Sequence, residues 1–183
     1  MVNLPGNIFS GFRGSIRTNY PMAEVTSFQT GGPAEIAVWP ERPEDLAPLL
    51  PRLFHASVPL TLLGNATNVL VSDKGIPGVT VLTADWTGIT WNNTECLCET
   101  GVRSTVLANM CLRRGQSGFE FAAGLPGSVG GGIIMNAGAY GGSFSDTLVE
   151  VSALCPDGTA ARFSGKNLRF EYRKTVFPIK DII

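Results

Sequence analysis

The apolar and polar positions in the first half of the chain predict short strands around one helix. Residues 35–40, EIAVWP, read as a strand, and residues 42–54, RPEDLAPLLPRLF, read as a helix with Glu44 and Asp45 in its first turn. An interior proline removes a helical hydrogen bond and clashes with the preceding turn, so we expect a kink or break at Pro51. Further strands are predicted at residues 59–64, 68–73 and 78–83.

The second half of the chain predicts two hairpins and a longer helix. Residues 89–101, ITWNNTECLCETG, suggest a hairpin that turns at Asn92-Asn93. Residues 103–114 have apolar side chains at 106, 107, 110 and 111, the spacing of one helical face, and Gly115 follows as a cap. Residues 147–165 alternate like two strands around the turn Pro156-Asp157-Gly158.

Composition changes this picture only by excluding some classes of protein. The 183 residues are 44% hydrophobic and 16% charged, with a net charge of −1, which fits a globular protein and neither a disordered chain nor a basic nucleic-acid binder. There is no apolar run long enough to span a membrane, and the first twenty residues lack the apolar core of a signal peptide. We therefore expect a cytoplasmic protein that binds neither nucleic acid nor membrane.

The cysteines and the single histidine do not form a metal-binding pattern. Cys96 and Cys98 flank one residue of a predicted strand, so both side chains point to the same face, and His55 is far from them in sequence. Cys111 and Cys155 follow no ligand spacing. We expect ordinary reduced thiols and no metal site.

A polar loop interrupts two apolar runs in residues 62–71, LLGNATNVLV. Its residues are Gly64, Asn65, Ala66, Thr67 and Asn68. Small and amide residues allow backbone N–H groups and a hydroxyl to converge on an anion such as a pyrophosphate. The loop matches no standard phosphate-binding fingerprint, so a plain polar turn between strands is the alternative.

The stretch GLPGSVGGGIIMNAGAYGG, residues 124–142, contains eight glycines and no charged residue. Glycine leaves no Cβ to block close approach, so this backbone could lie against a large flat ligand. Asn136 and Tyr140 are the polar side chains that could orient such a ligand, above the apolar residues 133–135. The alternative is a glycine-rich β-bulge region that serves tight packing alone.

A third motif, FEYRKTVFP at residues 170–178, contains Tyr172 and Arg173. The guanidinium of arginine is a fixed positive fork that suits an anion or a developing enolate. An ordinary surface arginine is the alternative interpretation.

Four motifs in this order resemble the UDP-N-acetylenolpyruvoylglucosamine reductases, the MurB family. They are TSFQTGGPAE (26–35), LLGNATNVLVSDKGIPGV (62–79), GFEFAAGLPGSVGGGIIMNAGAYG (118–141) and FEYRKTVF (170–177). The resemblance implies an α+β, two-lobed FAD-binding domain of the vanillyl-alcohol-oxidase (PCMH) type, with lobes at residues 1–87 and 88–183. It also implies reduction of UDP-N-acetylglucosamine enolpyruvate, with FAD as cofactor and NADPH as reductant.

The resemblance further implies a role for individual residues. The loop Gly64, Asn65, Ala66, Thr67, Asn68 would wrap the FAD pyrophosphate. The flavin would be lined by Gly127, Ser128, Gly131, Asn136, Ala137 and Gly138. Tyr140 would reach the nucleotide-sugar substrate, and Arg173 would bind the substrate and steady the enolate formed after hydride transfer.

The sequence departs from the family pattern at several places. Gln29-Thr30 stand where the family has Arg-Ile, and Ala66 replaces a glycine. The sequence ends at Ile183, before the Gly-Ser motif of the proton-donating serine and before the supporting glutamate, so we expect the third, substrate-binding domain to be missing. A non-catalytic FAD-binding remnant, a flavin-free nucleotide-binding domain and a flavin oxidase are the alternatives.

Overall fold

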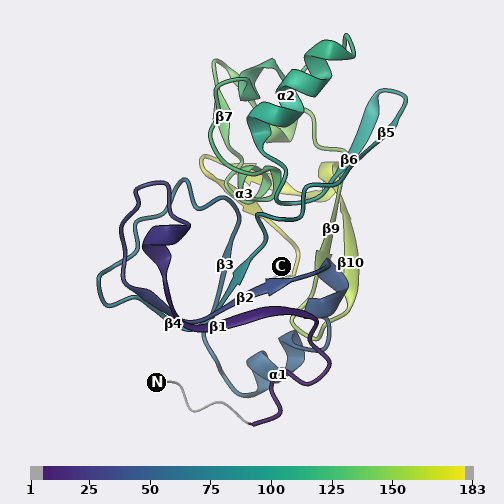
Figure 1. Ribbon diagram of the computed structural model, residues 1–183. Coiled ribbons are helices and arrows are strands. Elements are labelled where there is room, and N and C mark those ends of the chain that lie inside the picture. The colour runs from purple at the N-terminus through teal and green to yellow at the C-terminus, as the bar shows by residue number, and fades with distance from the viewer. Residues whose placement is uncertain (1–5, 180–183) are drawn as a thin grey trace. The chain divides into compact units, whose positions relative to one another are not determined.

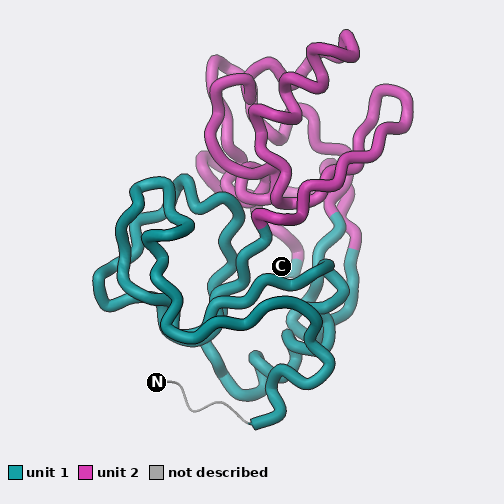
Figure 2. The backbone as a smooth tube through the Cα atoms, viewed as in Figure 1, with its two compact units in different colours: residues 1–83, 152–161, 179–183 teal, residues 84–151, 162–178 magenta. Residues whose placement is uncertain are grey.

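The computed structural model of the protein describes residues 6–179 and divides the chain into two compact units, coloured separately in Figure 2. The first unit comprises residues 1–83, 152–161 and 179–183, and the second comprises residues 84–151 and 162–178. This division differs from lobes at 1–87 and 88–183 because the tip of a late hairpin packs with the first unit. Gly158 at that tip lies so close to Ala47 that an added Cβ would be 2.2 Å from the Ala47 carbonyl oxygen.

The first unit is built on a four-stranded sheet (Figure 1). Its elements are β1 (Gly14–Pro21), η1 (Met22–Glu24), β2 (Pro33–Pro40), η2 (Pro43–Leu46), α1 (Leu50–His55), β3 (Leu60–Leu63) and β4 (Ile76–Leu82). The strand order is β1-β2-β4-β3, with β1 antiparallel to β2 and the other neighbours parallel. The expected strands at 35–40, 59–64 and 78–83 are therefore confirmed, and β1 is a strand that the pattern did not reveal.

The expected helix at residues 42–54 is two short helices, and the break falls before Pro51. The 3-10 helix η2 ends at Leu46, and α1 begins at Leu50 with Pro51 in its first turn. The first amides of a helix have no partner within that helix, so a proline there loses nothing. The break thus moves to a place where Pro51 is harmless.

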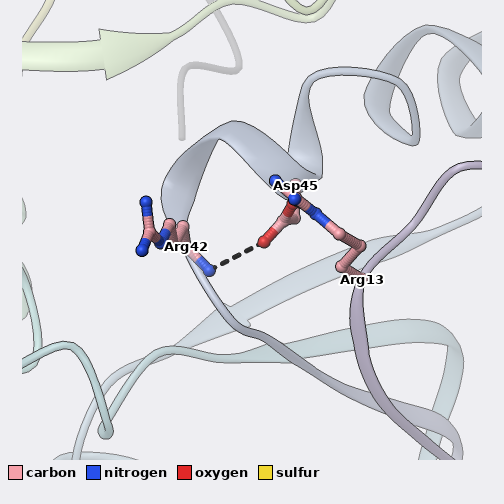
Figure 3. Close-up of polar contacts among 3 residues, drawn as sticks. All are labelled: Arg13, Arg42 and Asp45. Carbon is pink, nitrogen blue, oxygen red and sulfur yellow. Dashed lines mark hydrogen bonds and ion pairs between the residues drawn. The ribbon is translucent and has the colours of Figure 1, made fainter.

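A buried carboxylate starts the first of these helices (Figure 3). Asp45 is only 3% exposed, and its Oδ2 accepts a hydrogen bond of 3.0 Å from the backbone N–H of Arg42. The Nε of Arg13 donates to Oδ1 at 2.7 Å, and this contact raises the pKa of the Arg13 guanidinium. The buried charge is therefore both paired and hydrogen-bonded, as burial of an ion requires.

Residues 68–73 do not form the expected strand. This segment has no strand assignment, and the chain instead returns along the loop 26–32, where the N–H of Gly32 donates to the Ser72 carbonyl at 3.0 Å. Val71 is buried in the core of the first unit, while Leu70 is exposed. Val71, with the half-buried Val69, therefore accounts for the apolar pattern of this segment without a ladder of backbone hydrogen bonds.

The second unit combines short hairpins with two α-helices. Its elements are β5 (Ile89–Asn92), β6 (Glu95–Cys98), α2 (Ser104–Arg113), η3 (Glu120–Ala122), α3 (Val129–Ile134), β7 (Gly138–Ala139), β8 (Gly142–Ser143), η4 (Phe144–Asp146), η5 (Gly165–Asn167), β11 (Arg169–Glu171) and β12 (Lys174–Val176). β9 (Glu150–Leu154) and β10 (Ala160–Ser164) form a hairpin. Its turn and the adjoining strand residues, 152–161, belong to the first unit, and the start of β9 and the end of β10 belong to the second.

Three phenylalanines lie at the centre of the hydrophobic core of the second unit. Phe119, Phe121 and Phe144 are buried and meet edge to face, with ring centroids 5.0–5.7 Å apart. The expected helix at 103–114 is α2, and Gly115 follows it with a φ of +65°. The hairpins expected around residues 92–93 and 156–158 are present as β5–β6 and β9–β10.

Candidate functional site

The loop at residues 64–68 follows β3 in the first unit and has free amides. Ala66 is buried and takes a φ of +46°, and its carbonyl accepts a hydrogen bond of 3.2 Å from the N–H of Ser27. Within residues 6–179, the backbone N–H groups of Asn65, Ala66, Thr67 and Asn68 donate no hydrogen bond. Successive free amides around a left-handed residue make a concave site for an anion.

A second turn in the same unit supports this loop. The buried side chain of Thr26 donates to the Thr30 carbonyl at 2.8 Å and accepts from the Thr30 N–H at 3.3 Å. Gly31 packs against Val71 so tightly that an added Cβ would lie 2.7 Å from the Val71 Cβ. The turn 26–32 and the segment 64–72 are therefore one hydrogen-bonded body.

In the second unit the glycine-rich stretch forms a turn and the short helix α3, not a β-bulge. Ser128 is the N-cap of α3, and its Oγ accepts a hydrogen bond of 3.4 Å from the Gly131 N–H. Gly127 has a φ of +112°, which only glycine adopts readily, and its carbonyl accepts from the Ser104 N–H at 3.0 Å. The N–H of Val129 donates to the Val102 carbonyl at 2.7 Å. The turn is thus fixed to the start of α2.

The three consecutive glycines of α3 have different surroundings. A Cβ on Gly130 would lie 2.7 Å from the Thr100 Cβ, and a Cβ on Gly132 would lie 2.3 Å from a ring carbon of Phe144. Both glycines are therefore required by the packing of the protein itself. A Cβ on Gly131 would meet only the Ser128 Oγ, at 3.4 Å, which is ordinary contact. Gly131 is exposed, and nothing in the described protein needs a glycine there.

Tyr140 lies in the tight turn between β7 and β8. Its φ is +52° and that of Gly141 is +84°, the pair of left-handed conformations that a two-residue hairpin turn requires. The Tyr140 side chain is 98% exposed. The hairpin borders a cavity of about 380 Å³, which is also lined by Asn136 and by residues 170–173.

Arg173 occupies the turn of the β11–β12 hairpin on the same cavity. Its φ is +57°, it is exposed, and its guanidinium lies 5.7 Å from the centroid of the Tyr172 ring. With the residues that the structure describes, Arg173 forms no ion pair. Its positive charge is therefore available to a ligand in the cavity.

Two hydrogen bonds join the arginine hairpin to the end of the glycine-rich segment. The buried Thr175 donates from Oγ1 to the Ile133 carbonyl at 2.5 Å, and Asn136 donates from Nδ2 to the Glu171 carbonyl at 3.5 Å. The Oδ1 of Asn136 accepts from the Ser145 N–H at 3.1 Å. Both ends of the Asn136 amide therefore hold backbone together, a role that sequence reasoning missed, as it missed Thr175.

The structure thus brings together part of the residue set expected from the sequence. Asn136, Gly138, Tyr140 and Arg173 line one cavity of the second unit. The remaining expected residues of that unit, Gly127, Ser128, Gly131 and Ala137, lie on the same glycine-rich segment. The 64–68 loop belongs to the first unit. Its shared role with the cavity stays a prediction.

The cysteines are free thiols and contribute no group to this cavity. Cys96 and Cys98 point to the same face of β6, with their Sγ atoms 3.5 Å apart. Removal from water, together with the neighbouring Cys96 thiol, raises the pKa of Cys98. Among residues 6–179, no group of three or more His, Cys, Asp or Glu side chains has the geometry to hold a metal ion.

Comparison with known families identifies the class of protein. The model of a family described as "FAD binding domain" matches residues 34–164. The chain therefore belongs to this family of FAD-binding domains. In the part of the chain that the structure describes, every helix falls short of the length and apolarity that a membrane crossing needs.

Individual relatives confirm the more specific resemblance. The UDP-N-acetylenolpyruvoylglucosamine reductase of Caldanaerobacter subterraneus subsp. tengcongensis is 37% identical over 170 residues, which cover 93% of this chain and 56% of the relative. The chain thus spans a little over half the length of that relative. The crystal structure of the corresponding enzyme, MurB, from Thermus caldophilus superposes with a TM-score of 0.72 at 29% identity, covering 91% of this chain and 57% of the other.

Structures of oxidases confirm the fold class. The 6-hydroxy-D-nicotine oxidase of Arthrobacter nicotinovorans superposes with a TM-score of 0.63 at 14% identity, covering 90% of this chain and 38% of the oxidase. At that identity the likeness concerns the fold alone. The expected α+β FAD-binding fold of the vanillyl-alcohol-oxidase type is therefore confirmed.

Proposed function

We propose that the chain binds FAD and, with NADPH as reductant, reduces UDP-N-acetylglucosamine enolpyruvate to UDP-N-acetylmuramate. This would be a cytoplasmic step in the synthesis of peptidoglycan precursors. Membership of the FAD-binding family and the names of the relatives support the proposal. The chain covers only 56% of the length of the relative from Caldanaerobacter subterraneus. The enzymatic activity is therefore proposed for this chain and not inferred from the relative's name alone.

The observation that carries FAD binding is the open backbone at Gly131. A glycine inside a helix destabilises it by about 1 kcal/mol relative to alanine. The packing of the described protein explains Gly130 and Gly132 but does not explain Gly131. A ligand that lies directly against main chain explains it, and an isoalloxazine ring is such a ligand. The free amides of residues 65–68, in the first unit, suit a pyrophosphate such as that of FAD.

Two side chains on the cavity, Arg173 and Tyr140, provide groups for binding the substrate and for stabilising charge on it. Bound FAD, after accepting a hydride from NADPH, would supply a hydride to the alkene of the substrate, and protonation of the resulting enolate would need a separate acid. Arginine keeps its positive charge at neutral pH, so Arg173 can stabilise the negative charge that develops on the substrate but is a poor proton donor. Tyr140, almost fully exposed beside Arg173 on the same cavity, is placed to contact the nucleotide sugar. Asn136 positions this arrangement through its contacts with backbone.

The proposal is tested in two stages with the purified chain. Flavin absorbance and FAD released on denaturation measure binding. Anaerobic reduction of the bound flavin, followed by addition of the enolpyruvyl substrate, measures flavin reoxidation and product in a single turnover. A colourless protein that gains no flavin on titration would contradict FAD binding. Bound flavin without product would leave an FAD-binding domain and contradict the enzymatic half.

The role of Arg173 has a matched control in the same hairpin. Arg173→Lys keeps the charge but loses the planar fork, so we expect a slower single turnover with unchanged flavin content. Arg169 is also exposed, and it pairs with Glu171 at 2.9 Å. Because exposed ion pairs contribute little, Arg169→Lys should leave the rate unchanged. Equal rates for the two variants would remove Arg173 from the reaction.

A further inference from the structure

We propose that the ring of Phe28 is the stacking platform for the adenine end of the bound dinucleotide. Phe28 is 65% exposed, more than any other described phenylalanine of the first unit. An exposed phenyl ring forfeits the hydrophobic gain of burial, and a base stacked on it would restore part of that gain. This inference rests on the proposed function, and it adds a residue and a part of the ligand that the proposal leaves unassigned.

The turn that carries Phe28 is rigid. The N–H of Thr26 donates to the Met22 carbonyl at 2.9 Å, and the N–H of Gln29 donates to the Thr26 carbonyl at 3.0 Å. The buried Thr26 hydroxyl closes the turn onto Thr30. Gln29 takes a φ of +52°, which only a well-determined turn maintains in a residue with a side chain. The ring therefore projects from a preformed support, which reduces the entropy lost on binding.

The same turn is joined to the proposed pyrophosphate loop. The residue before Phe28, Ser27, donates its N–H to the Ala66 carbonyl at 3.2 Å, in the middle of the free amides of residues 65–68. In a dinucleotide the adenosine is attached directly to the pyrophosphate. A pyrophosphate held by those amides would thus lie next to the turn that bears Phe28, on the same unit. Stacking on an aromatic face suits a purine and needs no particular hydrogen-bond pattern.

The experiment compares three probes, FAD, FMN and ADP, on the parent chain and on Phe28→Ala. FAD and ADP contain adenine and a pyrophosphate, whereas FMN contains the flavin without adenine. We expect Phe28→Ala to weaken FAD and ADP by at least about fivefold, the lower range for loss of one base stack. FMN affinity should not change. Phe28→Trp should retain the affinity for FAD and ADP, because the larger ring still stacks.

A second exposed phenylalanine of the first unit provides the control. Phe54 is 37% exposed on α1, which lies away from the loop bearing η1 in Figure 1. Phe54→Ala should bind all three probes like the parent. Thermal midpoints of the variants, measured without ligand, show whether a loss of affinity reflects a loss of folding.

The outcomes separate this inference from the proposed function. If the parent binds FAD but Phe28→Ala binds FAD and ADP equally well, the adenine platform is refuted and FAD binding stands. If Phe28→Ala weakens FMN as much as FAD, the ring supports the loop in general and the inference is also wrong. If the parent binds ADP in a Phe28-dependent way but takes up no FAD, the adenine site stands and the proposed function fails.

Discussion

Single alanine substitutions at two neighbouring glycines of α3 can distinguish an effect on flavin binding from an effect on folding stability. In Gly132→Ala the new Cβ would lie 2.3 and 2.5 Å from two ring carbons of Phe144. Phe144 cannot move aside easily, because it is 3% exposed and packs edge to face on Phe119 and Phe121. Overpacking of this kind costs about 1–3 kcal/mol.

The corresponding change at Gly131 has the opposite effect on stability. The nearest atom to its added Cβ is the Ser128 Oγ at 3.4 Å, so the side chain fits. Alanine also gains up to about 1 kcal/mol over glycine in a helix. We therefore expect Gly131→Ala to be at least as stable as the parent, whereas Gly132→Ala should lose roughly 2 kcal/mol, or about 4–8 °C in Tm.

The second quantity to be measured is the affinity of each variant for FAD. If the flavin lies against the backbone at Gly131, the methyl group takes up space the ring needs, and Gly131→Ala should bind FAD at least about tenfold more weakly. Thermal unfolding without ligand and flavin titration are measured on both variants. Parent-like FAD affinity in a stable Gly131→Ala would remove this glycine from the site, and a parent-like Tm for Gly132→Ala would refute the packing argument.

Three further predictions concern the rest of the chain. Ala66→Gly should raise stability by about 0.5–1 kcal/mol in thermal unfolding, because φ at this position is +46°; a destabilised variant would contradict the strain. Thr67→Glu should weaken FAD in a flavin titration, because it adds negative charge beside the proposed pyrophosphate site, whereas Thr94→Glu on the β5–β6 turn should not; equal affinities would favour a plain turn. The raised pKa of Cys98 predicts that stability falls as pH rises above about 8.5, where the unfolded thiol ionises and the folded one does not; urea unfolding of Cys98→Ala should show a weaker fall.

The sequence predicted well those features that depend on local chemistry. The helix before Gly115 and the hairpin at residues 156–158 were confirmed, because spacing and turn residues specify them directly. The strand at 68–73 was wrong, since a buried Val71 gives the same apolar signal in an irregular segment. Asn136 could be identified as important, but its contact with the Glu171 carbonyl, 35 residues further along the chain, could not be foreseen.

The glycines illustrate the same limit within a single motif. The amino-acid sequence alone does not distinguish Gly131 from Gly132, because both belong to one apolar, glycine-rich run. The difference lies in Phe144, which folds back over one of them and not the other. Composition therefore predicted accessible backbone in this run, and three-dimensional packing was needed to show that it is Gly131 whose backbone no other described residue covers.

The hairpin tip that completes the first unit has a consequence for synthesis of the chain. Ala47 meets Gly158 only after the whole segment between them has been translated, because residues 152–161 belong with the first unit. The N-terminal 83 residues therefore leave the ribosome before the hairpin residues 152–161 that pack with them. Those contacts can form only after most of the second unit has been synthesised. Contacts so distant in sequence slow folding and extend the time during which apolar surface is open to aggregation. Expression of residues 1–83 alone should accordingly give a poorly soluble product.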